Sequence, residues 1–144
     1  LTGLARGGLD RAAVGRSCAE PPLLVSSPQV RHVALEPLSL AQQMALFDGA
    51  AGLLTVHGQA MAWVLFLPSH RRRVAALEIF PGGSVQNIYR AWCQVLGVRY
   101  KRLTAPIAGG CKSNKMNWLA CNVTVDVPEV VRAAHAAAGY IASR

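Results

Sequence analysis

The chain has 144 residues, and its 15 Lys and Arg against 7 Asp and Glu give a formal net charge of +8. With 52% hydrophobic and 15% charged residues it is too apolar for an intrinsically disordered chain, and its longest apolar run, residues 60–67, is too short to span a bilayer. The positive charge suits a polyanionic ligand. However, the cations are scattered and only 6% of the residues are aromatic, which is not the pattern of a nucleic-acid-binding surface.

The N-terminal part of the chain is predicted to be irregular. Residues 1–29 are rich in Gly, Ala, Arg and Pro and show no period, so we expect an irregular or truncated segment there and an ordered domain over residues 30–144. Alternation over residues 30–35 predicts a short strand. Ser39 and Gln42 then have the spacing of a capping box, which predicts a helix start. The buried face of this helix is predicted from its apolar residues at helical spacing: Leu40, Met44 and Phe47.

Two buried strands are predicted in the middle of the chain. Residues 53–57 form a β-branched and apolar run that ends at Gly58, and residues 74–80 form a second one. Between them, residues 59–67 predict a short apolar helix closed by Pro68. After the second strand, Ser84 is predicted to cap another helix, with an apolar face made of Val85, Ile88, Trp92, Val95 and Leu96.

The remaining elements complete an alternating pattern. Residues 98–103 and 122–127 predict a third and a fourth strand, and Pro128 stands where a first-turn proline belongs before an Ala-rich closing helix. Strands and helices that alternate in this way predict an α/β fold with a parallel sheet. Ligands of such folds bind outside the carboxyl ends of the strands, so chemistry is expected near His57, residues 78–84 and Thr104.

The four cysteines do not have metal-finger spacing, so no zinc site is expected. Cys93 lies inside a helical pattern and is predicted to be part of the core. Cys111 and Cys121 flank a polar segment and could close a disulfide loop in an oxidising compartment, but the sequence leaves this open. The tripeptide that begins at Asn122 is a glycosylation sequon within a predicted strand. These two features favour a secretory location weakly.

His57 and Gly58 are the first candidate site residues. A glycine permits close backbone approach, and the amides of the following helix would point at a bound anion. An imidazole at that position could hydrogen-bond a diphosphate. The alternative is a histidine whose hydrogen bonds are satisfied within a strand-end turn.

Glu78 is a carboxylate inside an otherwise apolar strand, where burial without a partner would be costly. Either it pairs with an arginine, such as Arg73 or Arg90, or it reaches into a cleft and accepts hydroxyl groups such as those of a ribose. Residues 71–73, three consecutive arginines, are expected to form a solvated loop.

Three further candidates follow Glu78. The turn that ends at Ser84 resembles an anion cradle, although it lacks the lysine of a P-loop. Asn87 and Tyr89 fall near the same edge of the predicted sheet. An exposed Asn and a packed Tyr are the alternative for these two residues. No nucleophile triad is recognisable, so the catalytic residues stay unassigned.

Several blocks of sequence also follow one another in a characteristic order. They are Ser39-Leu40-Ala41-Gln42-Gln43 with Phe47-Asp48-Gly49-Ala50, Leu53-Leu54-Thr55-Val56-His57-Gly58, Leu65-Phe66-Leu67-Pro68, Leu77-Glu78-Ile79-Phe80-Pro81, Asn87-Ile88-Tyr89-Arg90, and Leu96-Gly97-Val98-Arg99-Tyr100. This series, over roughly residues 30–140, resembles glycosyltransferase family 61. That family holds plant xylan xylosyl- and arabinosyltransferases, β-1,2-xylosyltransferase and animal O-linked GlcNAc transferases.

The resemblance implies an inverting, metal-independent GT-B enzyme that moves a sugar from a nucleotide donor, usually UDP-linked, to a glycan or glycoprotein acceptor. It implies residence in the lumen of the Golgi or endoplasmic reticulum behind an N-terminal membrane anchor. Residues 30–144 would be the C-terminal, Rossmann-like donor lobe, a three-layer parallel-sheet domain. A GT-B enzyme needs two lobes, so the acceptor lobe and the catalytic base would lie outside this chain.

The matched positions would put His57 and Gly58 at the donor diphosphate, Glu78 at the ribose, and Asn87 and Tyr89 at the edge of the donor site. At position 59 this chain has Gln where the family commonly has Ala. A non-catalytic Rossmann-like nucleotide-binding module is therefore an alternative function, and a basic nucleic-acid-binding domain is a third.

Overall fold

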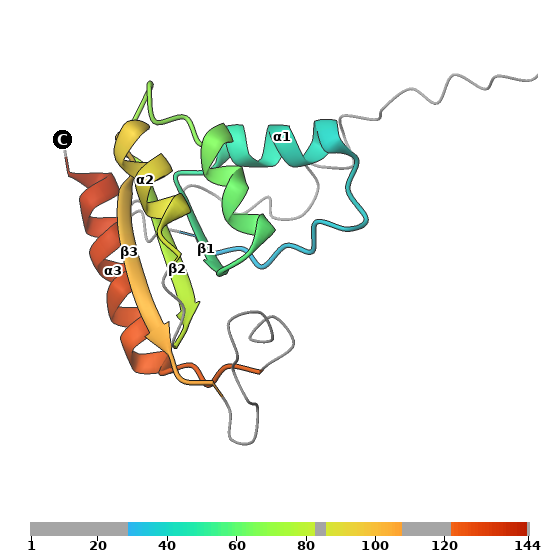
Figure 1. Ribbon diagram of the computed structural model, residues 1–144. Coiled ribbons are helices and arrows are strands. Elements are labelled where there is room, and N and C mark those ends of the chain that lie inside the picture. Colours follow the sequence, from blue (N-terminus) through green and yellow to red (C-terminus); the bar gives the residue numbers. More distant parts are fainter. Residues whose placement is uncertain (1–28, 83–85, 108–121, 144) are drawn as a thin grey trace, which may run out of the picture. The chain divides into compact units, whose positions relative to one another are not determined.

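The structure is a computed structural model that describes residues 29–82, 86–107 and 122–143 (Figure 1). The chain divides into two compact units, Leu1–His32 and Val33–Arg144, and the fold below is that of the second unit. Its elements in chain order are α1 (Leu40–Gly49), β1 (Gly52–Val56), the 3-10 helix η1 (Gln59–Phe66), β2 (Ala75–Pro81), α2 (Ile88–Val95), β3 (Arg99–Ala105) and α3 (Val127–Ala142).

The described strands form a parallel sheet in the order β1-β2-β3. The α/β class and the parallel sheet are confirmed. The register puts Thr55, Glu78 and Arg102 side by side across the sheet. Beyond the end of β1, the His57 amide donates to the Ile79 carbonyl at 2.8 Å, so the backbone pairing continues to His57.

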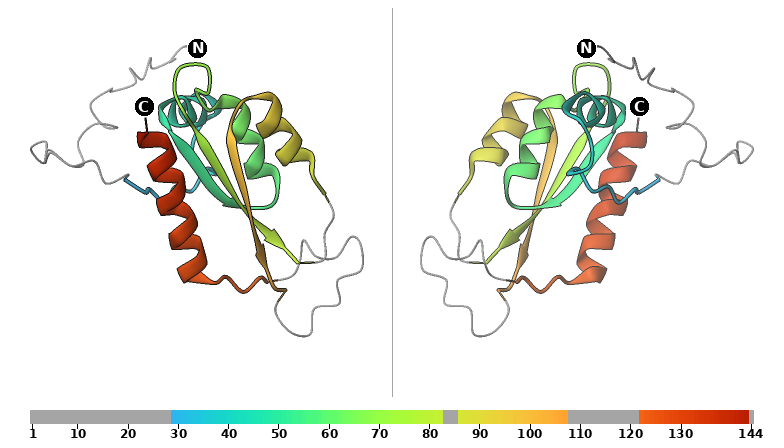
Figure 2. Two further views of the ribbon diagram at one scale, coloured as in Figure 1. Left: turned by 90° about the vertical axis from the view of Figure 1, so that its left-hand side faces the viewer. Right: turned by 90° about the vertical axis from the view of Figure 1, so that its right-hand side faces the viewer.

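Helices cover both faces of the sheet. The views of Figure 2 show α3 on one face and η1 with α2 on the other, and α3 contacts β2 and β3 while η1 contacts β1 and α2 contacts β3. Because β2 is covered on both faces, every one of its residues is buried. Strand β1 lies at the edge of the sheet and alternates between exposed and half-buried residues, so the prediction that it is fully buried is wrong.

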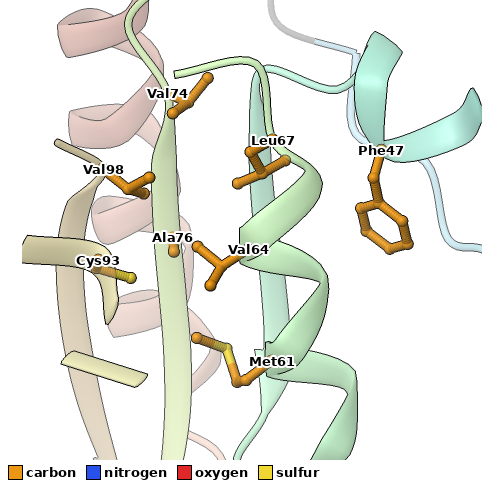
Figure 3. Packing of buried hydrophobic residues seen from close by; sticks show 8 residues of the cluster. All are labelled: Phe47, Met61, Val64, Leu67, Val74, Ala76, Cys93 and Val98. Carbon is orange, nitrogen blue, oxygen red and sulfur yellow. The ribbon is translucent and has the colours of Figure 1, made fainter. Parts of the chain in front are cut away.

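The main core lies between the sheet and the helices η1 and α2, with α1 outside η1 (Figure 3). Its buried members are Phe47, Met61, Val64, Leu67, Val74, Ala76, Cys93 and Val98. The predicted place of Cys93 in the core is confirmed. Phe47 attaches α1 to this core by stacking on Trp63 with ring centroids 4.8 Å apart. A smaller cluster around Ile79 and Leu103 packs against α3.

The predicted start of α1 is confirmed, whereas its predicted buried face is confirmed at Phe47 and wrong at Leu40 and Met44. The Ser39 side chain accepts from the Gln42 amide, and the Gln42 side chain accepts from the Ser39 amide at 2.8 Å, which completes the capping box. Leu40 and Met44 are 66% and 41% exposed, and only Phe47 is buried. The main neighbour of α1 is η1, so a single side of the helix is covered.

Two predicted strands do not form. Residues 30–35 have no regular structure, because alternation alone does not create a strand without a neighbour to pair with. In residues 122–127, Val123 makes one isolated antiparallel bridge with Ile107, and α3 begins at Val127 with Asp126 as its cap. The first-turn position of Pro128 is confirmed. Cys111 and Cys121 lie outside the described residues.

Helix α2 begins later than predicted. It starts at Ile88 with Asn87 at the cap position, so Ser84 does not cap it, and Ser84 itself lies outside the described residues. Ile88 and Val95 of the predicted apolar face are exposed, whereas Tyr89, Trp92 and Leu96 pack on the core. The shorter helix turns a different side toward the sheet. Gly97 follows it with φ of 68°, a conformation suited to a glycine after a helix end.

Candidate functional site at the carboxyl edge of the sheet

An acid–base pair is buried beside the carboxyl end of β1. Glu78, in the middle of β2, is 1% exposed, and His57, directly after β1, is 7% exposed. His57 Nδ1 pairs with Glu78 Oε1. Of the two alternatives left open for Glu78, the pairing with Arg73 or Arg90 does not occur. The carboxylate pairs with His57 and Tyr100 instead, and Arg73 donates to Ser143 and lies against the Tyr140 ring.

Tyr100 and Arg102 of β3 extend this pair. The Tyr100 hydroxyl donates to Glu78 Oε2, and Arg102 Nε donates to the Tyr100 oxygen at 3.2 Å. Both carboxylate oxygens of Glu78 therefore accept from the protein. We call His57, Glu78, Tyr100 and Arg102 the polar cluster. It crosses all three strands on the face that η1 and α2 cover.

Burial raises the pKa of Tyr100 to about 12, and the hydrogen bond to Glu78 adds to the increase. The phenol therefore stays protonated at neutral pH and keeps its role as donor to the carboxylate. Tyr89, on α2, also has a raised pKa, first because of burial and then because of the charge of Glu78. Both phenols are neutral groups that surround a single buried carboxylate.

The other nitrogen of His57, Nε2, contacts an exposed residue. Nε2 lies 3.2 Å from Oε1 of Gln86, an exposed residue, and the ring packs against Phe80 and Tyr89 with centroid distances of 4.5 and 5.4 Å. An amide group has both a donor and an acceptor, so Gln86 can pair with Nε2 in either protonation state of the imidazole. The ring is thus held by Glu78 through Nδ1 and contacts the exposed Gln86 through Nε2.

Gly58 has a conformation that essentially only glycine adopts. Its φ is 153° and its ψ is −168°, and it occupies the cap position of η1. The turn brings the first amides of η1 next to His57. Amides in the first turn of a helix have no partner within the helix, so this end of η1 can donate to an anion.

The structure brings some of the other predicted residues close to His57. Tyr89 lies against the imidazole and against Trp92. Asn87 accepts from Arg102 Nη2 at 2.9 Å through Oδ1, and the Gln86 carbonyl accepts from the same nitrogen at 2.8 Å. Residues 86 and 87 are therefore tied to β3 through Arg102.

Sequence reasoning missed Gln86, Tyr100 and Arg102. The two β3 residues alternate along the strand, which puts them on one face of the sheet, but a partner for Glu78 could be chosen only after the register of β2 and β3 was known. Gln86 carries no signal of its own in the sequence.

The three arginines at 71–73 lie in an exposed loop, as predicted, and two of them also hold the end of α1. Arg71 pairs with Asp48, and Arg72 donates to the Gly49 carbonyl at 2.6 Å. This loop takes no part in the polar cluster.

Within the described ranges, no group of three or more His, Cys, Asp or Glu side chains is arranged to hold a metal ion. Across those same residues, no helix has the length and apolar character needed to cross a membrane.

Comparison of the chain with models of known protein families, with curated proteins and with solved structures gave no match. The functional interpretation therefore depends on the residues themselves.

Proposed function

We propose that this chain is the donor-binding lobe of a glycosyltransferase related to family 61, which binds a nucleotide sugar, UDP-linked, at the carboxyl edge of its sheet. The proposal includes a Rossmann-like lobe of a GT-B enzyme, an inverting transfer that needs no metal, and a glycan or glycoprotein acceptor. It also includes a luminal location in the Golgi or endoplasmic reticulum with an anchor outside this chain. The acceptor lobe and the catalytic base are expected outside it too.

The observation that carries the proposal is the fixed imidazole at the start of η1. His57 is buried, tied to Glu78 through Nδ1, and followed by Gly58 and the first amides of a helix. A diphosphate needs donors that are already oriented and a positive charge close by. When the imidazole carries both protons, Nε2 can donate to a phosphate oxygen in place of Gln86 while Nδ1 donates to Glu78.

Glu78 acts in this scheme through His57. Its two oxygens accept from His57 and Tyr100, and it is almost fully buried. A ribose hydroxyl could reach it after one of these partners moved. We therefore assign it the role of a positioning residue that keeps the imidazole oriented.

The test is calorimetric titration of UDP and of uridine into the full chain and its variants. His57→Ala is expected to weaken UDP binding at least about tenfold, the usual effect of losing one charge-assisted hydrogen bond, and to leave uridine binding unchanged. Glu78→Gln should weaken UDP binding less, because it keeps the imidazole in place and removes only the carboxylate that orients it. Equal binding of UDP by all these proteins would refute the assigned site.

His135→Ala is the matched control, because it also removes a histidine, and His135 is an exposed residue of α3 outside the polar cluster. It should bind UDP as the unchanged chain does. Thermal melting of each variant establishes that a lost affinity does not come from unfolding.

Gln59 favours a second candidate function, a Rossmann-like module that binds nucleotides and performs no transfer. This residue opens η1 with an exposed side chain, where a phosphate would approach. If it hinders the donor, Gln59→Ala in a longer protein that includes the acceptor lobe should raise donor affinity. A nucleic-acid-binding domain would instead bind DNA or RNA more tightly than UDP, with a steep salt dependence.

A further inference from the structure

A second feature lies on the β3 side of the polar cluster. An open depression of about 310 Å³ is lined by Arg90 of α2 and by Tyr100, Lys101 and Arg102 of β3. Because β3 is an edge strand of the described sheet, the depression lies at that edge, beside α2 and β3. His57 does not line it.

The residues that line it include three cations and no acidic residue. Lys101 alternates with Tyr100 and Arg102 along the edge strand, so it also borders the face of the sheet that α3 covers. The ion pairs among the described residues join His57 with Glu78 and Arg71 with Asp48, so none of them neutralises this depression. The carboxylate of the polar cluster, Glu78, already accepts from His57 and from Tyr100. Cations that share one depression repel one another, and an anion between them would relieve that repulsion.

Arg102 is oriented before any ligand arrives. It donates from Nη2 to the Gln86 carbonyl and the Asn87 side chain, and its guanidinium stacks 3.9 Å from the centre of the Phe80 ring. Its Nε donates to Tyr100. No described residue accepts from Nη1, so that group can still donate to a ligand. A guanidinium held in this way loses little conformational entropy on binding.

We propose that this depression binds one tetrahedral oxyanion group, a phosphate or sulfate, carried by a ligand. Arg102 would supply a fixed donor and the exposed Arg90 a second cation from α2. The exposed Lys101, which starts on the other face of β3, would reach the remaining oxygens around this edge strand with its long side chain. Three cations around one group match the charge and the several acceptor oxygens of such an anion better than those of a single carboxylate. The proposal does not depend on the function assigned to His57.

Inorganic phosphate and inorganic sulfate, titrated separately into the full chain at constant ionic strength and followed by amide chemical shifts, provide the test. The shifts are expected to concentrate at Arg90 and at residues 100–102. Arg90→Gln and Lys101→Gln should each weaken binding about fivefold or more, and the double variant should bind no measurable phosphate. Both residues are exposed, so the variants should melt as the unchanged chain does.

The control is Arg132→Gln, which removes one exposed cation from α3. It should leave phosphate binding unchanged. An equal loss in all three single variants would overturn the proposal, because binding would then reflect net charge alone. Failure of the unchanged chain to bind either ion would overturn it as well.

UDP identifies the source of the group. If the Arg90 and Lys101 variants lose UDP affinity together with His57→Ala, the oxyanion is the diphosphate of the donor. If they lose phosphate or sulfate while UDP binding persists, the site receives a separate phosphorylated or sulfated ligand. Either result upholds the depression as an oxyanion site. Loss of UDP binding in His57→Ala, with UDP binding kept in the Arg90 and Lys101 variants, would support the proposed function. The phosphate titration of the Arg90 and Lys101 variants is interpreted separately from that result.

Discussion

Replacing Tyr100 with phenylalanine removes a single hydroxyl from the polar cluster and keeps the ring. That hydroxyl donates to Glu78 Oε2 and accepts from Arg102 Nε, so its loss leaves a buried carboxylate oxygen without its donor. A hydrogen bond to a charged group contributes about 1.5–3 kcal/mol. Tyr100 is half-buried and water can replace part of the bond, so we expect the free energy of unfolding to fall by about 1.5–2 kcal/mol.

For a domain of this size, that change lowers the melting temperature by about 5–8 °C. Urea denaturation followed by circular dichroism gives the free energy, and a thermal melt gives the shift. Tyr140→Phe is the matched control, because the Tyr140 ring lies near the Arg73 and Arg99 guanidinium groups while its hydroxyl has no hydrogen bond within the described residues. It should change stability by less than about 0.5 kcal/mol. Equal effects of the two substitutions would refute the argument.

Two further predictions concern pH and the backbone. The pKa of Tyr100 is about 12 in the folded chain against an ordinary value of 10.0, so its contribution to stability should be complete below pH 10 and be lost as the pH rises toward 12. Between pH 10 and 12, the urea midpoint of Tyr100→Phe should fall less steeply with pH than that of the unchanged chain. Parallel curves for the two proteins would contradict the raised pKa of Tyr100. Gly58→Ala should cost about 1–3 kcal/mol through backbone strain alone, since no atom lies within 4 Å of an added Cβ. Gly49→Ala has the same open space without a positive φ, so denaturation midpoints that fall equally in both variants would contradict this explanation.

The parallel sheet could be predicted because its signals are local and strong. A buried parallel strand requires a continuous apolar run, and β2 has one on either side of Glu78. The start of α1 is equally local, since Ser39 and Gln42 satisfy each other within one turn. Elements with such local signals can be predicted with little information about the rest of the chain.

The elements that were predicted wrongly depend on distant partners. Residues 30–35 and 122–127 have the composition of strands, yet a strand forms only where a neighbouring strand presents its hydrogen-bonding edge. The buried face of α1 depends on the place of η1, which no pattern within α1 encodes. The helical spacing of apolar residues predicts the burial of Leu40. That spacing shows which residues share a side of the helix, but it does not show which side packs against η1.

The candidate site could be predicted in part, because some of its residues have a signal in their local sequence. His57, Gly58 and Glu78 stand out because each is unusual in its local sequence. Their combination depends on the sheet, since 20 residues separate Gly58 from Glu78 in the chain while β1 and β2 are adjacent. Tyr100 is ordinary in a strand and became relevant only through its register.

The energetic cost of burying the polar cluster favours a binding role for it. A carboxylate in the centre of a fully buried strand costs desolvation energy that an ion pair rarely recovers, and apolar residues of similar volume are often as stable or more so. Here the carboxylate holds an imidazole at the strand end and, through Tyr100, holds a guanidinium at the next strand. One buried carboxylate therefore orients an imidazole at the start of η1 and a guanidinium that lines the depression along β3. The core alone requires neither orientation, whereas an anionic ligand that reached this edge would require both.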